Sequence, residues 1–269
     1  FNLAQALLFV PVVRPLAQAL ERWMAPPPQV DERTPRHLDR LALDTPSLAL
    51  SCAAREALRQ ADAVETMLRG IVPVIRGNDL GEAERLRDMD DVVDALYSAI
   101  KLYLTQISRQ PLSERESQRW TEIVSFTINM EQIGDIIERV LQDVEDKKIR
   151  KRRFSEAGMA EIIHLHERLM ANLRLGMSVF LDGHPRDAQR LLEEKARFRE
   201  LEHAYAGKHL DRLKENTADS IETSSLHLDL ISDLKRINSH ICSIAYPILD
   251  SAGALAPSRI RESKFSELG

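Results

Sequence analysis

The sequence of 269 residues has little of what all-β and disulfide-rich proteins need. It contains only 10 glycines and 5% aromatic residues, which argues against sandwiches, barrels and propellers with their many tight turns. Its two cysteines, Cys52 and Cys242, are too far apart in the sequence for a zinc motif or a disulfide framework. Lysine and arginine number 37 against 42 aspartates and glutamates, so the basic excess of a nucleic-acid-binding domain is missing as well.

Catalytic signatures are also absent from the sequence. There is no glycine-rich phosphate-binding loop, no HExxH metalloprotease motif and no GxSxG nucleophile elbow. We therefore expect no catalytic residues and a protein that is not an enzyme.

The most apolar part of the chain is its beginning. Residues 1–13 contain only Asn2 and Gln5 as polar groups, but a helix of that length rises only about 20 Å, against about 30 Å of membrane hydrocarbon. Because the sequence starts at Phe1 rather than at a methionine, we interpret residues 1–25 as the end of a last transmembrane helix and its interfacial segment. The alternative is an apolar helix that caps a soluble core.

Three consecutive prolines mark the next boundary. Pro26, Pro27 and Pro28 cannot continue a helix and favour an extended spacer, so residues 26–45 are predicted to be a linker. Thr45 followed by Pro46 is typical of a helix start. At the other end of the chain, residues 253–269 are expected to form a flexible tail.

From residue 46 onward the sequence predicts long helices almost throughout. The third of them carries an apolar stripe at steps of three and four residues from Phe126 to Val144. The sixth repeats this stripe from Leu230 to Ile248, 104 residues later. Such a period is the mark of a duplicated structural unit.

A matching turn supports the duplication. The turn around Gly77 is followed 106 residues later by a similar turn around Gly183. The sequence therefore predicts an all-α fold of two tandem three-helix bundles, the first over residues 46–147 and the second over residues 153–252.

Three carboxylates lie on one face of the third predicted helix, because Glu131, Asp135 and Glu138 are spaced i, i+4 and i+7. A bound cation would offset their repulsion, and oxygen ligands suit divalent or ferric cations. Aspartates on the preceding helix would complete the metal site, namely Asp88, Asp91 and Asp94. The alternative, which the residues alone favour, is a solvated acidic face.

The sixth helix does not repeat this acidic face. Lys235, Ser239 and Cys242 stand at the corresponding positions, and an acidic pair, Asp229 and Asp233, comes one turn earlier. Any second metal site would therefore be built differently and would bind more weakly.

Two segments resemble the signature of a known family. NMEQIGD, from Asn129 to Asp135, resembles the DLERIGD signature of PhoU-like domains, and DLKRINSH, from Asp233 to His240, resembles its second copy. The order of segments is also similar to the C-terminal part of bacterial sodium/phosphate cotransporters, in which a membrane segment beginning Phe-Asn precedes a PhoU-like domain. The stretches that carry this second resemblance include FNL at 1–3, LDTP at 43–46, AIKLYL at 99–104 and SSLHLDL at 224–230.

The resemblance implies a fold of two three-helix bundles and a metal-binding E-x-x-x-D pair in each signature. The first copy keeps the pair as Glu131 and Asp135, whereas the second departs from it with Lys235 and Ser239. The Gln-Ser-Ser-Ser repeat that binds phosphate and sodium in the transporter family is absent from these residues, so the transport site is not located here.

We therefore expect the C-terminal regulatory part of a sodium-dependent inorganic phosphate symporter, which modulates phosphate uptake across the inner membrane with its helical domain in the cytoplasm. Expected partners are the membrane part of the same transporter, inorganic phosphate and sodium, without nucleic acid; a homo-oligomer is left open. The only expected cofactor is a divalent or iron cation. Its predicted ligands are Glu131, Asp135, Asp91, Asp94 and Asp233.

Two alternatives remain open at this stage. The first is a soluble PhoU-like signalling adaptor that acts on a transporter or a kinase in trans. The second is a helical scaffold that binds no metal.

Overall fold

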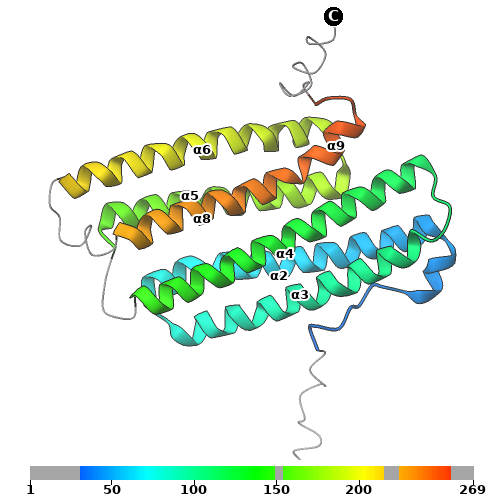
Figure 1. The fold of residues 1–269 in the computed structure, drawn as a ribbon, viewed down its shortest axis with the longest axis horizontal. Coiled ribbons are helices and arrows are strands. Elements are labelled where there is room, and N and C mark those ends of the chain that lie inside the picture. Colours follow the sequence, from blue (N-terminus) through cyan, green and yellow to red (C-terminus); the bar gives the residue numbers. More distant parts are fainter. Residues whose placement is uncertain (1–30, 149–153, 215–223, 256–269) are drawn as a thin grey trace, which may run out of the picture. The chain divides into compact units, whose positions relative to one another are not determined.

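The computed structural model describes residues 31–148, 154–214 and 224–255 (Figure 1). The apolar segment at 1–25 and most of the expected tail lie outside these residues. None of the helices that the structure describes is long and apolar enough to cross a membrane.

The chain divides into two units, Phe1–Thr34 and Pro35–Gly269. The described end of the first unit is a turn in which the Thr34 N–H donates to the Asp31 carbonyl at 3.0 Å. The second unit holds all the described helices, and the rest of this section concerns that unit by itself.

The described part of Pro35–Gly269 is helical and contains no strand, which confirms the predicted all-α class. Its elements, in chain order, are η1 (Arg40–Asp44), α2 (Pro46–Gly77), α3 (Leu80–Ile107), α4 (Glu114–Lys148), α5 (Glu156–Asp182), α6 (Pro185–Lys214), α8 (Ser224–Ser243) and α9 (Ala245–Ser251). Helices α2, α3 and α4 pack on one another as one bundle, and α5, α6 and α8 form a second (Figure 1). The two tandem three-helix bundles are therefore present as predicted.

The turns that separate the helices are built by the residues that mark them in the sequence. Asn78 after α2 and Gly183 after α5 both adopt the left-handed conformation, with φ of 53° and 64°. Asp79 caps α3 by accepting a hydrogen bond from the Glu82 N–H at 3.0 Å. Pro46 occupies the first turn of α2, as the Thr45-Pro46 pair predicts.

The sixth predicted helix is broken near its end. Helix α8 stops at Ser243 and α9 begins at Ala245, so the stripe continues to Ile248 across a break. The cause is Pro247, which has no N–H to donate to the carbonyl of Ser243 and whose ring crowds that carbonyl.

Both predicted stripes form the core of their bundles. All their members are buried: Phe126, Met130, Ile133, Ile137, Val140 and Val144 on α4, and Leu230, Leu234, Ile237 and Ile241 on α8, Ile244 at the break and Ile248 on α9. Burying apolar side chains of this size stabilises the fold by about 1.5–3 kcal/mol each. The apolar stripe that is repeated in the sequence thus forms the core of both bundles.

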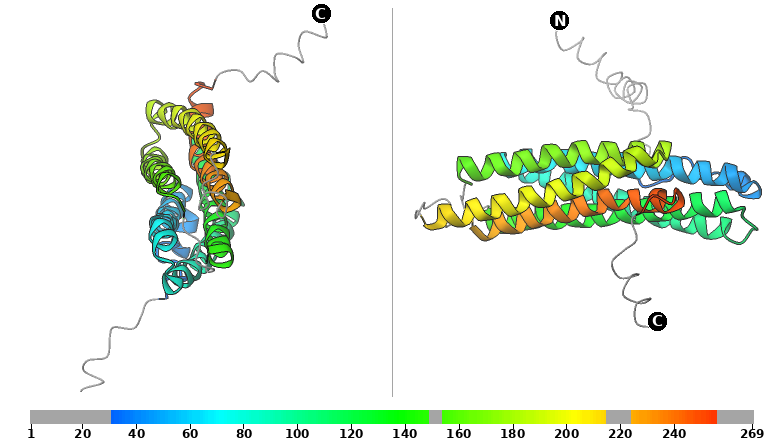
Figure 2. Two further views of the ribbon diagram at one scale, coloured as in Figure 1. Left: turned by 90° about the vertical axis from the view of Figure 1, so that its left-hand side faces the viewer. Right: turned by 90° about the horizontal axis from the view of Figure 1, so that it is seen from above.

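The bundles also pack on each other, α4 against α8 and α2 against α5. The axes of the long helices are roughly aligned (Figure 2). The rings of Phe126 and Phe180 stack across this interface with centroids 3.9 Å apart. His166 on α5 is buried and its Nε2 lies 2.8 Å from the Leu68 carbonyl of α2. The second unit therefore has one continuous core.

The described end of the predicted linker is held on the first bundle. The N–H groups of Arg36 and His37 donate to Glu56 Oε2 at 2.9 and 2.6 Å, and Glu56 is completely buried in α2. The Tyr103 hydroxyl donates to the Asp39 carbonyl at 2.6 Å. The chain is thereby fixed in place several residues before α2 begins.

Candidate functional site

Three aspartates meet between α3 and α4 in the first bundle. Asp90 and Asp94 come from α3 and Asp135 comes from α4, and one carboxylate oxygen of each lies within 4.8 Å of the others. Asp90 is buried, whereas Asp94 and Asp135 are exposed. We call these three residues the acidic cluster. Its outer side is open to solvent and its inner end is a buried carboxylate.

A glycine allows the two helices to approach at this point. A Cβ on residue 134 would lie 2.6 Å from Asp90 Oδ1 and 3.3 Å from Val93 Cγ1. Glycine in a helix interior costs about 1 kcal/mol relative to alanine, so its presence in α4 calls for a reason. The reason is that only a residue without a side chain leaves room for the Asp90 carboxylate.

Burial and the crowding of carboxylates together raise pKa values in the acidic cluster. Burial is the main cause that raises the pKa of Asp90 to about 7, and the charges of Asp94, Glu138, Asp135 and Asp91 raise it further. The pKa of Asp94 is raised by burial first and then by Asp135 and Asp91. Around pH 7 the Asp90 carboxyl is therefore partly protonated, and a bound cation would favour its charged form.

The residues present fit the cation that the family resemblance implies. Asp90 Oδ1 is buried and has no hydrogen-bond partner within the described part of the chain. A buried charged oxygen without a partner costs more than about 1–3 kcal/mol, and a hard cation would satisfy it. Three carboxylate oxygens, with water completing the shell, are ligands that divalent and iron cations accept.

Of the predicted ligands, Asp94 and Asp135 belong to the acidic cluster. Asp91 lies near enough to raise the pKa of both Asp90 and Asp94, but it is not one of the three converging residues. Glu131 Oε2 accepts a hydrogen bond from Gln132 at 2.8 Å and is likewise outside the converging set.

Asp233, the last of the predicted ligands, is paired with two arginines. Its Oδ1 accepts hydrogen bonds from Arg139 of α4 at 2.6 Å and from Arg236 of α8 at 3.2 Å. Two guanidinium groups therefore compete with any cation for this carboxylate, and the Arg139 contact links the two bundles.

The sequence prediction missed Asp90, the buried member of the cluster. A signal for it exists in the sequence. Leu86, Asp90 and Val93 follow one another at steps of four and three on α3, so Asp90 occupies a core position between two buried apolar residues. The preceding residue on α3, Met89, is by contrast only partly buried.

The second bundle has no acidic cluster at the corresponding place in its described residues. Lys235, which replaces Glu131, binds Glu202 with its Nζ 3.0 Å from Oε1. Asn238, which replaces Gly134, accepts a hydrogen bond from Asn172 at 2.9 Å. The counterparts of Glu131 and Gly134 in the second bundle are thus engaged with protein side chains.

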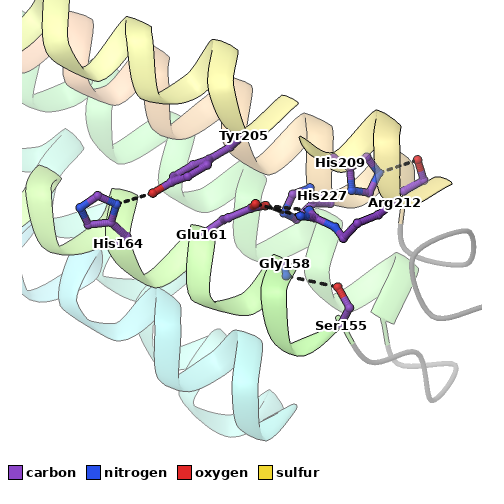
Figure 3. Close-up of polar contacts among 9 residues, drawn as sticks. Ser155, Gly158, Glu161, His164, Tyr205, His209, Arg212 and His227 are labelled. Carbon is purple, nitrogen blue, oxygen red and sulfur yellow. Dashed lines mark hydrogen bonds and ion pairs between the residues drawn. The ribbon is translucent and has the colours of Figure 1, made fainter. Parts of the chain in front are cut away.

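A second group of buried polar residues lies at the other end of the second bundle (Figure 3). Arg212 of α6 binds both oxygens of Glu161 on α5, at 2.9 and 2.7 Å. His227 of α8 packs beside this pair with its Nε2 3.4 Å from Glu161 Oε2. The ring of His209 stacks on that of His227 with centroids 4.5 Å apart. This group ties α5, α6 and α8 together.

The geometry of this group argues for a structural role. Both ring nitrogens of His227 lack a hydrogen bond within the described residues, and burial is the main cause that lowers its pKa to about 4. The pKa of His209 is lowered as well, first by burial and then by the charge of Arg212. Arg212 balances the charge of the buried Glu161 carboxylate, as the packing of a buried ion pair requires.

Comparison with known proteins agrees with the fold and the duplication. The PhoU domain family matches the chain twice, over residues 57–144 and 162–248. The proteins called "Putative inorganic phosphate export protein YjbB" in Escherichia coli K12 and in Salmonella typhimurium are each 45% identical to this chain over 252 residues. These residues make up 93% of the chain, and the chain spans 46% of the length of either relative.

Two solved structures have the same fold. PhoU from Pseudomonas aeruginosa superposes with a TM-score of 0.70 at 16% identity, over 77% of this chain and 98% of that one. The phosphate transport system regulatory protein PhoU from Streptococcus pneumoniae gives a TM-score of 0.70 at 17% identity, over 80% of this chain and 100% of that one. At such low identity the likeness concerns the fold alone.

Proposed function

Because this chain belongs to the PhoU domain family, we propose that it is a regulatory module of phosphate transport across a membrane, and that it has no catalytic activity of its own. The observation that carries the proposal is the double family match, together with the 45% identity to relatives named as phosphate export proteins. Helical bundles without a catalytic constellation in the described residues suit a module that acts by binding.

The direction of transport in this proposal follows the relatives. The sequence predicts control of phosphate uptake by a sodium symporter, whereas the names of the relatives at 45% identity speak of export. We therefore propose that the module limits or permits the release of inorganic phosphate from the cell. Coupling of that flux to sodium stays a prediction of the family resemblance.

The first form of the proposal is an adaptor that binds a transporter or a kinase in trans. Its support is that the two PhoU structures match this chain over 98% and 100% of their own length. In those structures the two bundles therefore make up nearly the whole chain. The free thiols Cys52 and Cys242 suit the reducing cytoplasm, where such an adaptor would work.

The second form is a module joined to the transporter in one polypeptide. A specific observation favours it, since the chain spans about half the length of the relatives that it matches. In this form the remaining half of such a protein would carry the flux and the bundles would control it. Phosphate, sodium and the membrane part would then be partners of the whole protein.

In both forms regulation requires that the module binds two states of the transporter unequally, because a module with equal affinity for both states shifts nothing. We propose that a divalent or iron cation on the acidic cluster helps to set this preference. A cation held by Asp90 and Asp94 on α3 and by Asp135 on α4 would fix the spacing of these two helices. Loss of the cation would let them relax apart.

The test is a flux measurement in cells from which the gene has been deleted. The cells are loaded with labelled phosphate, and uptake and release are followed with the whole gene, with a form that lacks residues 46–252, or with no gene. We expect cells with the truncated form to release labelled phosphate at a different rate from cells with the whole gene. An unchanged flux in both directions would contradict the proposal.

The same cells separate the two forms. Residues 46–252 are supplied as a separate polypeptide, either alone in deleted cells or beside the truncated gene. Control by the separate polypeptide in cells with no other copy of the gene would support the adaptor. Control only when the truncated gene is also present would support the joined module. Replacing sodium by potassium in the medium tests the sodium requirement.

A further inference from the structure

The second bundle has a positively charged cleft between α6, α8 and α9. Its volume is about 330 Å³, and it is lined by Leu192, Lys195, Ala196, Arg199, Lys235, Asn238, Ser239 and Tyr246. The lining thus contains three cationic side chains and no carboxylate. A volume of this size is at the lower end of the range of small-ligand sites.

The cleft takes the place that the acidic cluster has in the first bundle. α6 packs against α8 as α3 packs against α4. At the 104-residue offset, Lys235 replaces Glu131 and Ser239 replaces Asp135. The duplicated framework therefore presents cations in one copy where it presents carboxylates in the other.

Two of the three cations are available to a ligand. Within the described ranges, neither Lys195 nor Arg199 forms an ion pair, and Arg199 is exposed. Lys195 Nζ donates to the Tyr246 hydroxyl at 3.3 Å, which positions the ammonium without neutralising it. Lys235 is shared with Glu202 at 3.0 Å. The cleft consequently keeps a positive charge.

Neutral donors accompany the charge. The Tyr246 hydroxyl accepts from Lys195, so its own proton is left to donate. Asn238, which also lines the cleft, is buried and its side-chain oxygen accepts from Asn172, so this bond does not use its amide donors. The positive charge of Lys195 also acts on the neighbouring His240. The pKa of His240 is lowered by burial first and then by the charges of Arg236 and Lys195.

We propose that this cleft binds a phosphate oxyanion, with Arg199 and Lys195 as its principal ligands. Charge-assisted hydrogen bonds from guanidinium and ammonium groups to phosphate oxygens are about twice as strong as neutral ones. The charge of the cleft requires an anion; the choice of phosphate among anions rests on the proposed role in phosphate transport. The source is either free inorganic phosphate or the phosphate end of a nucleotide.

The test measures binding to the full chain by calorimetry at low ionic strength, in one arm with inorganic phosphate and in another with ATP. A chelator is present, so that phosphate cannot bind through a cation on the acidic cluster. We expect saturable one-to-one binding in at least one arm, and the tighter arm identifies the source. Arg199→Ala and Lys195→Ala should each weaken it about tenfold or more.

The matched control is Arg186→Ala, which removes an exposed arginine of α6 that does not line the cleft. Its affinity should equal that of the unmodified chain, and circular dichroism should show all three variants fully folded. Absence of binding at millimolar phosphate and ATP would overturn the proposal. Binding that Arg199→Ala and Lys195→Ala leave unchanged would do so too.

This outcome is independent of the proposed function. A chain that controls phosphate flux in cells but binds neither ligand would remove only the phosphate cleft. A chain that binds phosphate through Arg199 without any effect on flux would instead remove the role in transport.

Discussion

Gly134 and Asp90 lie so close together that a Cβ on residue 134 would stand 2.6 Å from Asp90 Oδ1. The glycine of the family signature and the buried carboxylate of the neighbouring helix therefore depend on each other. The Asp90 carboxylate can lie close to that of Asp135 only because the neighbouring residue on α4, Gly134, has no side chain.

Replacing Gly134 by alanine should weaken metal binding without unfolding the protein. The new methyl group forces the Asp90 carboxylate aside, while alanine improves helix propensity by about 1 kcal/mol, so the two effects on stability oppose each other. We expect a metal affinity about 10–100-fold lower, as for other changes that misplace a ligand. Metal titration followed by thermal melting measures both quantities.

The matched control is Gly207→Ala in α6, where an added Cβ meets nothing within 4 Å. It should raise the free energy of unfolding by up to about 1 kcal/mol and leave metal affinity as it was. Equal metal affinity in Gly134→Ala and the unmodified chain would show that Asp90 is not a ligand.

Asp90→Asn should change stability in opposite directions with and without metal. In the folded protein the pKa of Asp90 is raised to about 7, so the folded state prefers the neutral form and loses stability as the pH rises from about 4 through 7. In chelator at pH 8, the neutral amide should therefore be more stable by about 1–3 kcal/mol. With a saturating divalent cation, the unmodified chain should gain stability and the variant should gain little.

Denaturant unfolding with and without chelator checks this prediction. Asp88→Asn is the control, because Asp88 is exposed on the same helix and lies outside the acidic cluster. If Asp90→Asn and Asp88→Asn respond alike to metal, the acidic cluster is only a charged surface.

The His227 side chain should make the second bundle sensitive to acid. Its folded pKa is lowered to about 4, chiefly by burial and then by His209, so the folded state binds fewer protons than the unfolded state between about pH 6.5 and 4. The stability that it contributes is complete above about pH 6.5 and is lost as the pH falls through 4. Arg212 on α6 opposes protonation and Glu161 on α5 favours it.

His227→Leu should flatten the pH dependence of the unfolding free energy in that window. His203→Leu is a suitable control, because its side chain is 75% exposed. Unfolding by urea at several pH values gives the two slopes, and a slope that His227→Leu does not reduce would contradict the assignment.

Removing one partner of the Glu161–Arg212 ion pair should lower the free energy of unfolding more than removing both. Arg212→Met leaves the buried Glu161 carboxylate without its two hydrogen bonds, and we expect a loss of about 3–5 kcal/mol. The double variant Glu161→Met with Arg212→Met leaves no buried charge and should recover part of that loss. A double-mutant cycle measures the coupling, and simple additivity would speak against a coupled pair.

The helices and their duplication could be predicted because apolar periodicity records packing directly. The stripe from Phe126 to Val144 and its copy from Leu230 to Ile248 are buried along their whole length. The break after Ser243 was harder to predict. Pro247 weakens the helix there, but periodicity alone carries the stripe through to Ile248 without interruption.

The candidate site could be predicted only in part. Asp94 and Asp135 stand on exposed faces where spacing indicates which side chains share a face. Asp90 sits in a core stripe, where a single polar residue looks like an irregularity until the opposite helix is known. Asp233 was predicted as a ligand from its i, i+4 spacing with Asp229, but its partner Arg139 lies 94 residues earlier, and sequence spacing carries no information on such a contact.

The anchoring of the segment before α2 has a mechanical consequence. Arg36 and His37 are fastened by their backbone to the buried Glu56, and the Asp39 carbonyl is fastened to Tyr103. A displacement of the backbone at residues 36–39 would therefore act directly on α2 and α3, which carry Glu56 and Tyr103. Since α3 also carries Asp90 and Asp94, such a displacement would act on the helix that holds two of the three members of the acidic cluster.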